Sequence, residues 1–574
     1  MAYTVFDKTI KIVYAAGASD VELTACAEIG RFWKKVTGTA PACIREEAYK
    51  GGKAILVNTK TVPFAASAKY DPKALGEEGV FYAIDGETVF LGGGSLRGVL
   101  YSAYTFLEEE IGCHRYTEDL EICPKREKLV FENKVYSFVP PMHYRAASFA
   151  DGEDGAYAVF NKLNARTSIK PEFGGSVEFG VGFVHTLHTL VPSSLFEAHP
   201  EYFPMIDGKR QDGPWYQRCL TNPDVLKMTI EKVRADFRAH PDHKTASVSQ
   251  ADTGEEPFCC TCPECQKIND EEGSLMGTQL RFVNAVADAV KDEFPDRYIE
   301  TLAYRFTRHI PKKTKPRDNV IIRLCSIECC FSHPIDQCQH GNPAFVADMC
   351  DWAKISRNIY IWDYVTNFSH YLAPQPNLPV LAPNMKFFVD HRTVGMFPEG
   401  APDARGSELS ELKSWLLAKL EWDPDFDTEK GTEDFVRAYA GNGAEPILAY
   451  IRRLNERPVI TGSHRTCYAQ PDKEFFSEEF MAAGETDFRA AKEAVTDAET
   501  LKRIRRWEMS LRYIRLVLYP ELYETEQLRA MIRTFVLEMK ELGISKVHEG
   551  GTWETSERVI CDRIRARLPE FTME

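Results

Sequence analysis

The sequence lacks several features that would assign it to a broad class at once. None of its 574 residues belongs to an apolar run of about 18, the length that a membrane-spanning helix requires. It has no block of basic residues and carries a net charge of −15, so nucleic acid and anionic membranes are poor partners. The N-terminus has no continuous apolar segment of the kind found in secretory signals, which predicts a cytoplasmic location. With no internal repeat and no low-complexity tract, the chain should form ordinary globular domains.

The 16 cysteines are clustered unevenly and do not indicate a disulfide framework. Two adjacent pairs occur, Cys259-Cys260 and Cys329-Cys330, and adjacent cysteines fit such a framework poorly. We therefore expect a reducing environment in which most thiols are free.

Five short, apolar, β-prone segments recur along the middle of the chain, and helical patterns fill much of the space between them. This alternation predicts a parallel sheet with helical crossovers. Each segment ends in polar residues, and polar groups just past the strand ends build the active sites of (β/α)8 barrels. The fold class is therefore α/β with a central (β/α)8 TIM-type barrel. The five segments are 247–252, 299–305, 320–328, 359–364 and 393–399.

The chain is too long for one hydrophobic core and divides into three predicted domains. Residues 1–135 read as a small α/β domain with strands at 54–57, 80–84 and 88–91. The Val139-Pro140-Pro141 sequence marks a linker, and the barrel should occupy residues 140–402. Beyond it the pattern becomes helical, for example at 410–420 and 500–514, so we expect a C-terminal α-helical domain over 405–574.

A glycine-rich segment, residues 92–98, lies between a predicted strand and a predicted helix. Such a turn invites comparison with nucleotide-binding loops. The spacing does not match G-x-G-x-x-G, no Walker lysine follows, and no parallel βαβ unit is evident. A close strand–helix turn is the preferred interpretation.

Four carboxylates at the strand ends are the candidate catalytic residues: Asp252, Glu328, Asp363 and Glu399. Glycosidic bond hydrolysis needs a proton donor with a raised pKa and a group that stabilises the developing positive charge. Glu328 follows an apolar run and is flanked by cysteines, so its surroundings should favour the protonated acid. Each carboxylate also has a structural alternative: a loop cap for Asp252, a buried ion pair for Glu328, a pair with Arg305 or Arg323 for Asp363, and a rim position for Glu399.

Polar and aromatic residues near these carboxylates are candidates for sugar binding. Sugar faces stack on aromatic rings, and amides and guanidinium groups bind hydroxyl groups. Two histidines three residues apart could instead form a metal pair, although hydrogen bonding at a pocket wall is the simpler interpretation. The predicted substrate-binding residues are Tyr304, Arg305, Trp362, Tyr364, Asn367, His185, His188 and Gln250.

A cysteine-rich segment follows Asp252 and suggests a structural metal. Cys262-Pro263-Glu264-Cys265 is a turn that presents two thiolates to one ion. Cys260 and Cys219 are the candidates that would complete a tetrahedral zinc site, and four thiolates would leave no open position for substrate. The alternatives are free or disulfide-paired cysteines, or an iron–sulfur cluster. No catalytic cofactor is expected.

Taken together, these segments resemble glycoside hydrolase family 163, a bacterial family formerly catalogued as domain of unknown function 4838. The resemblance spans about residues 10–520 and implies an N-terminal domain like those before other glycosidase barrels, a (β/α)8 barrel and a helical C-terminal domain. It implies endo-β-N-acetylglucosaminidase activity on glycans. Ala251 departs from the pattern, in which Asn is usual before Asp252. The matching pieces are Glu78–Tyr82, Leu96–Tyr101, Phe106–Glu109, Pro200–Phe203, Cys219–Pro223, Ser249–Asp252 with the cysteine segment Cys259–Cys265, Ala303-Tyr304, Ile327-Glu328, Trp362–Tyr364 and Asn367-Phe368.

The sequence therefore predicts a retaining glycoside hydrolase that cleaves a β-linked N-acetylhexosamine with assistance from the 2-acetamido group. Glu328 is the predicted acid and Asp363 the predicted polarising group, with Glu399 and Asp252 as reserves. Three alternatives stay open: an exo-glycosidase of another sugar, such as a uronic acid bound by Arg305 or Arg323; a non-catalytic carbohydrate-binding barrel; and a cysteine- or metal-dependent redox protein. The oligomeric state is not predicted.

Overall fold

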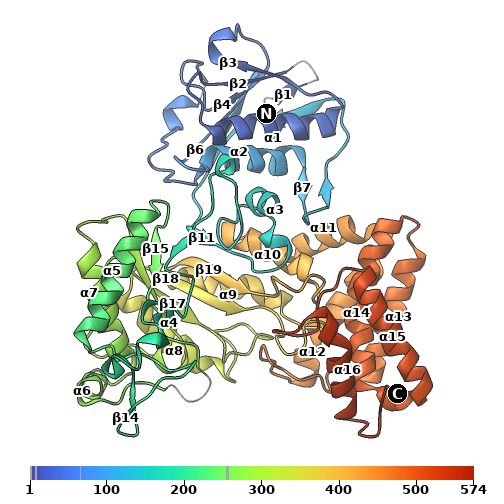
Figure 1. Ribbon diagram of the computed structural model, residues 1–574. Coiled ribbons are helices and arrows are strands. Elements are labelled where there is room, and N and C mark those ends of the chain that lie inside the picture. The colour runs from blue at the N-terminus through green and yellow to red at the C-terminus, as the bar shows by residue number, and fades with distance from the viewer. Residues whose placement is uncertain (1–2, 7–9, 65, 254–257, 574) are drawn as a thin grey trace.

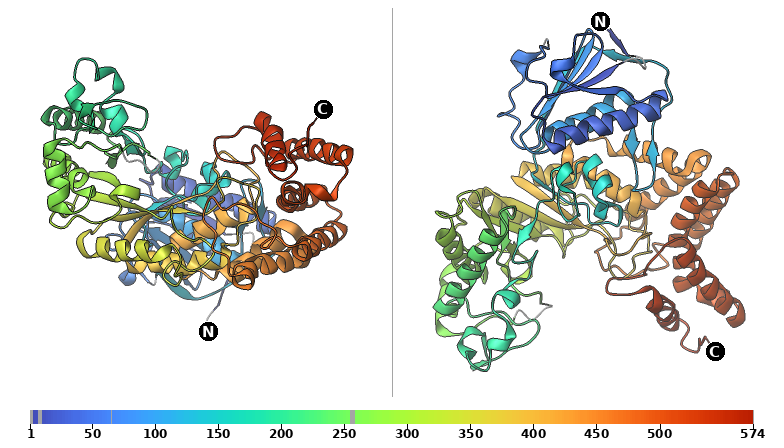
Figure 2. Two further views of the ribbon diagram at one scale, coloured as in Figure 1. Left: turned by 90° about the horizontal axis from the view of Figure 1, so that it is seen from below. Right: turned by 45° about the horizontal axis from the view of Figure 1, so that its top comes forward.

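The computed structural model describes residues 3–6, 10–64, 66–253 and 258–573, and it has three parts (Figure 1). An N-terminal sheet with two covering helices lies at one end. A curled parallel sheet with its helices forms the centre, and a group of helices forms the C-terminal part. Figure 2 shows that the central and C-terminal parts enclose a concave side of the molecule. Within the described residues no helix is both long enough and apolar enough to cross a membrane.

The N-terminal part is a six-stranded mixed sheet with the order β10-β5-β6-β4-β2-β3. The predicted strands at 54–57, 80–84 and 88–91 correspond to β4, β5 and β6. We did not expect a parallel βαβ unit, and this expectation was wrong, because β2 pairs in parallel with both β3 and β4. The four-residue β2 is too short to show a clear period. The elements are α1 (Asp20–Thr37), α2 (Gly98–Phe106), β2 (Lys11–Tyr14), β3 (Ala42–Arg45), β4 (Ala54–Val57), β5 (Val80–Asp85), β6 (Thr88–Gly93) and β10 (Lys134–Phe138), with β1 (Tyr3–Phe6) paired to β9 (Leu129–Glu132).

The glycine-rich segment is a close strand–helix turn, as predicted. A Cβ atom at Gly93 would lie 2.1 Å from the carbonyl carbon of Gly98, and one at Gly98 would lie 2.4 Å from the carbonyl oxygen of Gly79. Only glycine allows the backbone to approach this closely. The nearby Arg97 is buried and forms an ion pair with Glu78, which also binds Arg145 of the central sheet at 2.6 Å. Glu78 therefore joins two parts of the chain.

The central part is a parallel sheet of seven strands in the order β11-β19-β18-β17-β16-β15-β12. Four of the five predicted strands are present as β16 to β19, and they lie next to one another. The fifth prediction, 247–252, was misplaced, because β15 spans Thr245–Ser247 and the predicted segment overlaps it only at Ser247. Helices α5, α7 and α9 pack against the strands of this sheet, and α6 packs against α7. The elements are β11 (Tyr144–Arg145), β12 (Phe179–Gly180), β15 (Thr245–Ser247), β16 (Tyr298–Ala303), β17 (Val320–Cys325), β18 (Ile359–Tyr364), β19 (Thr393–Glu399), α3 (Gly155–Phe160), α4 (Leu187–Leu190), α5 (Pro223–Ala239), α6 (Pro263–Glu272), α7 (Met276–Val290), α8 (Asn342–Ile355) and α9 (Leu378–Asp390).

A short backbone bridge connects the two edges of this sheet. The amide of Ala165 donates to the carbonyl of Arg145 in β11 at 3.1 Å, and the amide of Val177 donates to the carbonyl of Asn164 at 2.7 Å. Residues 177–180 lead directly into β12 at the other edge. Residues 164–165 thus lie between the first and last strands of the curled sheet.

The interior of the curled sheet contains a buried ion pair. Arg323 donates to Glu300 at 2.6 Å, and both side chains are fully buried. Five aromatic rings surround the guanidinium group at 4.8–6.0 Å, which provides cation–π stabilisation: Tyr144, Phe179, Phe183, Tyr360 and Phe397. The alternative in which Arg323 pairs with Asp363 or binds a substrate acid is contradicted, because its partner is Glu300 and it is inaccessible.

The C-terminal part is helical, as predicted. Its helices pack against the central sheet, and their buried side chains form one hydrophobic cluster with those of the sheet. The loops between these helices reach back to the ends of the strands. The helices are α10 (Ser410–Trp422), α11 (Thr428–Ala440), α12 (Ala444–Thr461), α13 (Glu478–Glu493), α14 (Ala498–Leu518), α15 (Thr525–Glu541) and α16 (Trp553–Arg565).

Candidate active site

A pocket of about 230 Å³ opens at the carboxyl ends of strands β15 to β19. It contains three carboxylates and four large aromatic side chains, a composition suited to holding a sugar between charged and flat groups. Two of its walls come from the C-terminal part of the chain. The lining residues are His185, Asp252, Leu302, Tyr304, Cys325, Ile327, Trp362, Tyr364, Glu399, Tyr468 and Glu549.

Glu399 has the environment of a proton donor. It is the last residue of β19, and the indole N–H of Trp362 donates to its carboxylate at 2.9 Å. Burial is the main cause that raises its pKa to about 7; the negative charges of Glu549 and Asp252 also raise it, while the Trp362 hydrogen bond lowers it. At neutral pH a substantial fraction of this carboxyl group is therefore protonated.

Asp252 comes from a different part of the sheet than Glu399. It follows β15, which is separated from β19 by three strands. Both carboxylates line the same pocket, and the charge of Asp252 contributes to the raised pKa of Glu399. The two groups are therefore placed to act on one bound molecule.

Asp363 does not line the pocket, contrary to its predicted role. Side chains alternate along a strand, and its neighbours Trp362 and Tyr364 both line the pocket with rings stacked 6.2 Å apart. Asp363 therefore faces the other side of β18, where it accepts a hydrogen bond of 2.7 Å from Ser326. Burial raises its pKa to about 6.

Glu328 also lies outside the pocket, and the apolar environment predicted for it was wrong. Its side chain is 43% exposed and forms a salt bridge of 2.8 Å with Arg308. The adjacent Cys329 is fully buried, so the apolar residues around Glu328 in the sequence belong to the core while its own side chain points outward. The alternative for Glu328 was a buried ion pair; the ion pair with Arg308 is present, but the carboxylate is exposed.

The predicted sugar-binding residues divide into two groups. His185, Tyr304, Trp362 and Tyr364 line the pocket. Arg305 lies beside it, with its Nε donating to the Tyr304 hydroxyl at 2.9 Å. His185 and Arg305 both have positive φ, +55° and +49°, a strained backbone conformation that is often found at functional sites.

The other predicted sugar-binding residues do not reach the pocket. The amide of Gln250 is buried and donates to Thr307 at 2.7 Å. The amide of Asn367 is buried and donates to the carbonyl of Ala469 at 2.7 Å. His188 is exposed on α4, away from His185, so the two do not form a metal pair.

Two pocket residues were not identified from the sequence. Tyr468 comes from the loop between α12 and α13, and Glu549 from the loop between α15 and α16. The backbone amide of Glu549 donates to the carbonyl of Phe368 at 2.9 Å, which holds this distant loop against the strand ends. Burial and the charges of Asp403 and Asp252 raise the pKa of Glu549. Nothing in the local sequence marks either residue.

Residues 115–453 match the family described as Domain of unknown function (DUF4838), and this match covers more than half of the chain. The chain belongs to the DUF4838 family. Comparison with curated protein sequences gave no significant match.

The fold of this DUF4838 protein is similar to that of solved glycoside hydrolases. One is a family GH115 4-O-methyl-α-glucuronidase, BtGH115A, with specificity for decorated arabinogalactans; it shares 10% sequence identity at a TM-score of 0.59, over 99% of this chain and 80% of that one. Another is a family 89 glycoside hydrolase from Clostridium perfringens in complex with PUGNAc, with 11% identity and a TM-score of 0.48 over 96% of this chain and 70% of that one. At 10% identity the similarity to the GH115 enzyme concerns the fold alone.

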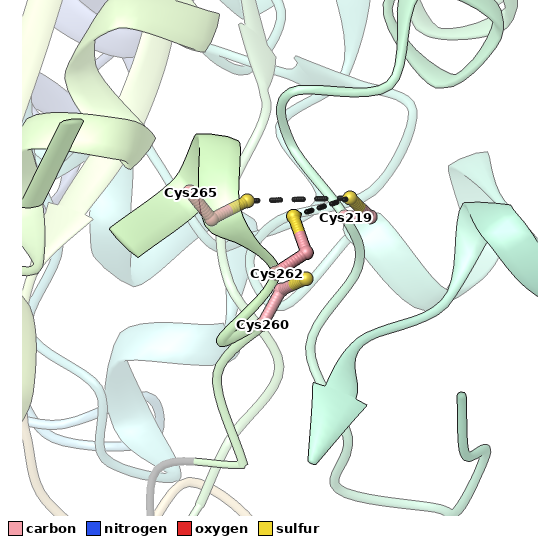
Figure 3. A group of neighbouring side chains, drawn as sticks. All are labelled: Cys219, Cys260, Cys262 and Cys265. Carbon is pink, nitrogen blue, oxygen red and sulfur yellow. Dashed lines mark hydrogen bonds between the residues drawn. The ribbon is translucent and has the colours of Figure 1, made fainter. Parts of the chain in front are cut away.

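The four predicted zinc ligands of this DUF4838 protein lie together (Figure 3). The sulfur of Cys219 is 3.8 Å from that of Cys262 and 4.0 Å from that of Cys265. Cys260 is the fourth member; all four side chains are buried, and their sulfurs lie within 4.8 Å of one another. A tetrahedral ion with Zn–S bonds of about 2.3 Å needs sulfur separations of about 3.8 Å, so the set fits zinc.

Proposed function

We propose that this protein is a glycoside hydrolase in which Glu399 is the general acid. The observation that carries the proposal is the position of Glu399, a carboxyl group with a pKa of about 7 that shares an aromatic-lined pocket with Asp252. Glycosidases need this combination of a protonated acid and a second carboxylate at one bond. The fold similarity to a GH115 enzyme supports the same class.

The architecture we propose is a closed (β/α)8 barrel flanked by the domains 1–135 and 405–574. The bridge through residues 164–165 supports this, because it occupies the place of an eighth strand between β11 and β12. The active site of such a barrel lies at the carboxyl ends of its strands, where the pocket is found.

For the substrate we propose a β-linked N-acetylhexosamine cleaved with retention of configuration. The 2-acetamido oxygen attacks the anomeric carbon and the bond to the leaving oxygen breaks, while Glu399 gives that oxygen its proton. Asp252 accepts a hydrogen bond from the acetamido N–H and stabilises the positive charge of the oxazolinium intermediate. Water, deprotonated by Glu399, then opens the ring and restores the acid. The resemblance to glycoside hydrolase family 163 supports this choice of sugar.

The charge of the pocket disfavours the uronic acid alternative. Asp252 and Glu549 would repel a substrate carboxylate, and Arg323 is already paired with Glu300. Arg305 is the remaining predicted cation, and its Nε is occupied by the Tyr304 hydroxyl. We therefore expect a neutral sugar.

The test is a panel of aryl glycosides combined with profiling of glycans released from a glycoprotein. We expect turnover of the β-N-acetylglucosaminide and none of the β-glucuronide. Release of a glycan that retains one N-acetylglucosamine would assign endo action. Glycan binding without any product, unchanged in Glu399→Gln, would instead support the carbohydrate-binding alternative and refute the enzyme.

We also propose one structural zinc ion at Cys219, Cys260, Cys262 and Cys265. All four would bind as thiolates, so the ion would hold the loop around Cys219 against the start of α6 and would have no open position for substrate. Elemental analysis of protein purified without added metal tests this. Cys262→Ser should remove one zinc ion per chain, and an unchanged zinc content would refute the site.

A further inference from the structure

A second cluster of cysteine and histidine side chains lies between the loop after β17 and the loop between α12 and α13. Its members are Cys330, His333, Cys338 and His464, and one ligand atom of each lies within 4.8 Å of the others. The first three follow a C-x2-H-x4-C spacing, and the fourth comes from more than 120 residues further along the chain. The proposed mechanism uses none of them.

We propose that these four residues bind a second zinc ion, in a Cys2His2 site. Two distances support tetrahedral coordination. The sulfur of Cys330 is 3.4 Å from Nδ1 of His333, and the sulfur of Cys338 is 3.3 Å from Nδ1 of His464. Zn–S bonds of about 2.3 Å and Zn–N bonds of about 2.0–2.1 Å place such atoms about 3.6 Å apart.

The surroundings of the cluster suit a structural ion. Both cysteines are buried, whereas His464 is exposed, so the ion would be reached from the surface through the histidine. The ring centroids of His333 and His464 lie 4.5 Å apart with an interplanar angle of 35°, and each ring has a nitrogen within 4.8 Å of the other ligand atoms. Binding would displace the two thiol protons and give a neutral site, with two thiolates opposite one Zn²⁺.

The ion would brace one wall of the active-site pocket. The two loops already meet through backbone bonds, since the amide of Phe331 donates to the carbonyl of Arg465 at 2.9 Å. Four residues beyond His464 in the same loop, Tyr468 lines the pocket. Zinc at Cys338 and His464 would therefore fix the segment that positions Tyr468.

Site-specific zinc counting tests this proposal. The wild-type chain, purified under reducing conditions without added metal, should contain two zinc ions, and His464→Ala or Cys338→Ser should leave one. Cys262→Ser should also leave one, at this second site. Cys350→Ser is the matched control, because Cys350 lies 3.5 Å from His391 in an isolated Cys–His pair and should not bind zinc.

A second measurement separates this site from the four-cysteine site. Cobalt(II) substitution gives thiolate-to-metal bands that grow with the number of thiolates. The difference spectrum between wild type and His464→Ala should show a two-thiolate site, and because His464 is exposed this variant should fold normally. Zinc content that His464→Ala leaves unchanged would overturn the proposal. So would a disulfide between Cys330 and Cys338 in freshly purified reduced protein.

Discussion

Four carboxylates lie at or near the ends of the central strands, but only two of them line the pocket. Glu399 and Asp252 line the pocket with Trp362 and Tyr364. Asp363 and Glu328 lie equally close to strand ends, yet one is buried against Ser326 and the other is exposed and paired with Arg308. The end of a parallel strand brings a residue to the catalytic rim, but the alternation of side chains decides whether it faces substrate.

The sharpest test of this comparison is Glu399→Gln against Glu328→Gln. We expect the first to lower kcat on a natural glycan by about 100-fold or more, because proton transfer is worth roughly 10²–10⁴. The second should change kcat less than about twofold. Steady-state kinetics measures both. For an aryl glycoside with an acidic phenol, Glu399→Gln should lower kcat much less, since this leaving group needs no proton. A larger loss of kcat in Glu328→Gln than in Glu399→Gln would return the acid role to Glu328.

The second test exchanges the polarising residue. Asp252→Asn should lower kcat by about 100-fold on natural and aryl substrates alike, because stabilisation of the acetamido attack is needed whatever group leaves. Asp363→Asn keeps the hydrogen bond partner of Ser326 and should retain most activity. A loss in Asp363→Asn equal to that in Asp252→Asn, with normal folding by circular dichroism, would contradict the assignment by strand face.

The pH profile should identify the acid. Glu399 is active when protonated and its pKa is about 7, so kcat/KM should fall as pH rises through about 7. Glu549→Gln removes a negative charge that raises this pKa, so the falling limb should move to lower pH, by about half a unit. A limb that stays in place in Glu549→Gln would show that the titrating group is not Glu399.

The smallest expected effect concerns stability. The pKa of Glu399 is raised above its unfolded value of about 4.3, so ionisation in the folded state costs free energy that grows as pH rises from about 4.3 to 7. Glu399→Gln should therefore stabilise the protein at pH 8 relative to wild type, by about 1–3 kcal/mol, and have little effect at pH 4. Urea unfolding at the two pH values measures this, and a destabilised variant at pH 8 would argue against a buried carboxyl group.

Much of the fold could be predicted from the sequence, because the central strands have long apolar runs. Residues 320–325 and 359–364 are buried on both sides and read clearly as strands. The edge strand β12 is only two residues long, so it leaves no pattern.

The site was predicted only in part, for two physical reasons. Strand alternation separates Asp363 from Trp362, and the sequence offers no way to decide which of the two faces inward when both are flanked by apolar residues. Glu549 reaches the pocket through a tertiary contact with Phe368, a loop packing that depends on the whole C-terminal part. The cysteine spacing was more informative, since Cys262 and Cys265 lie on one turn and constrain each other locally.

The carboxylate of Glu78 has a consequence for how this protein can be divided. It binds both Arg97 of the N-terminal part and Arg145 of β11, and all three are buried. A shortened chain beginning at residue 140 would lose the counter-ion of Arg145, and breaking a buried ion pair by removing one partner typically costs about 3–5 kcal/mol. Arg145 lies in the strand beside β19, the strand that ends in Glu399. The N-terminal region thus supplies a buried counter-ion to the central sheet, and a minimal catalytic fragment has to include it.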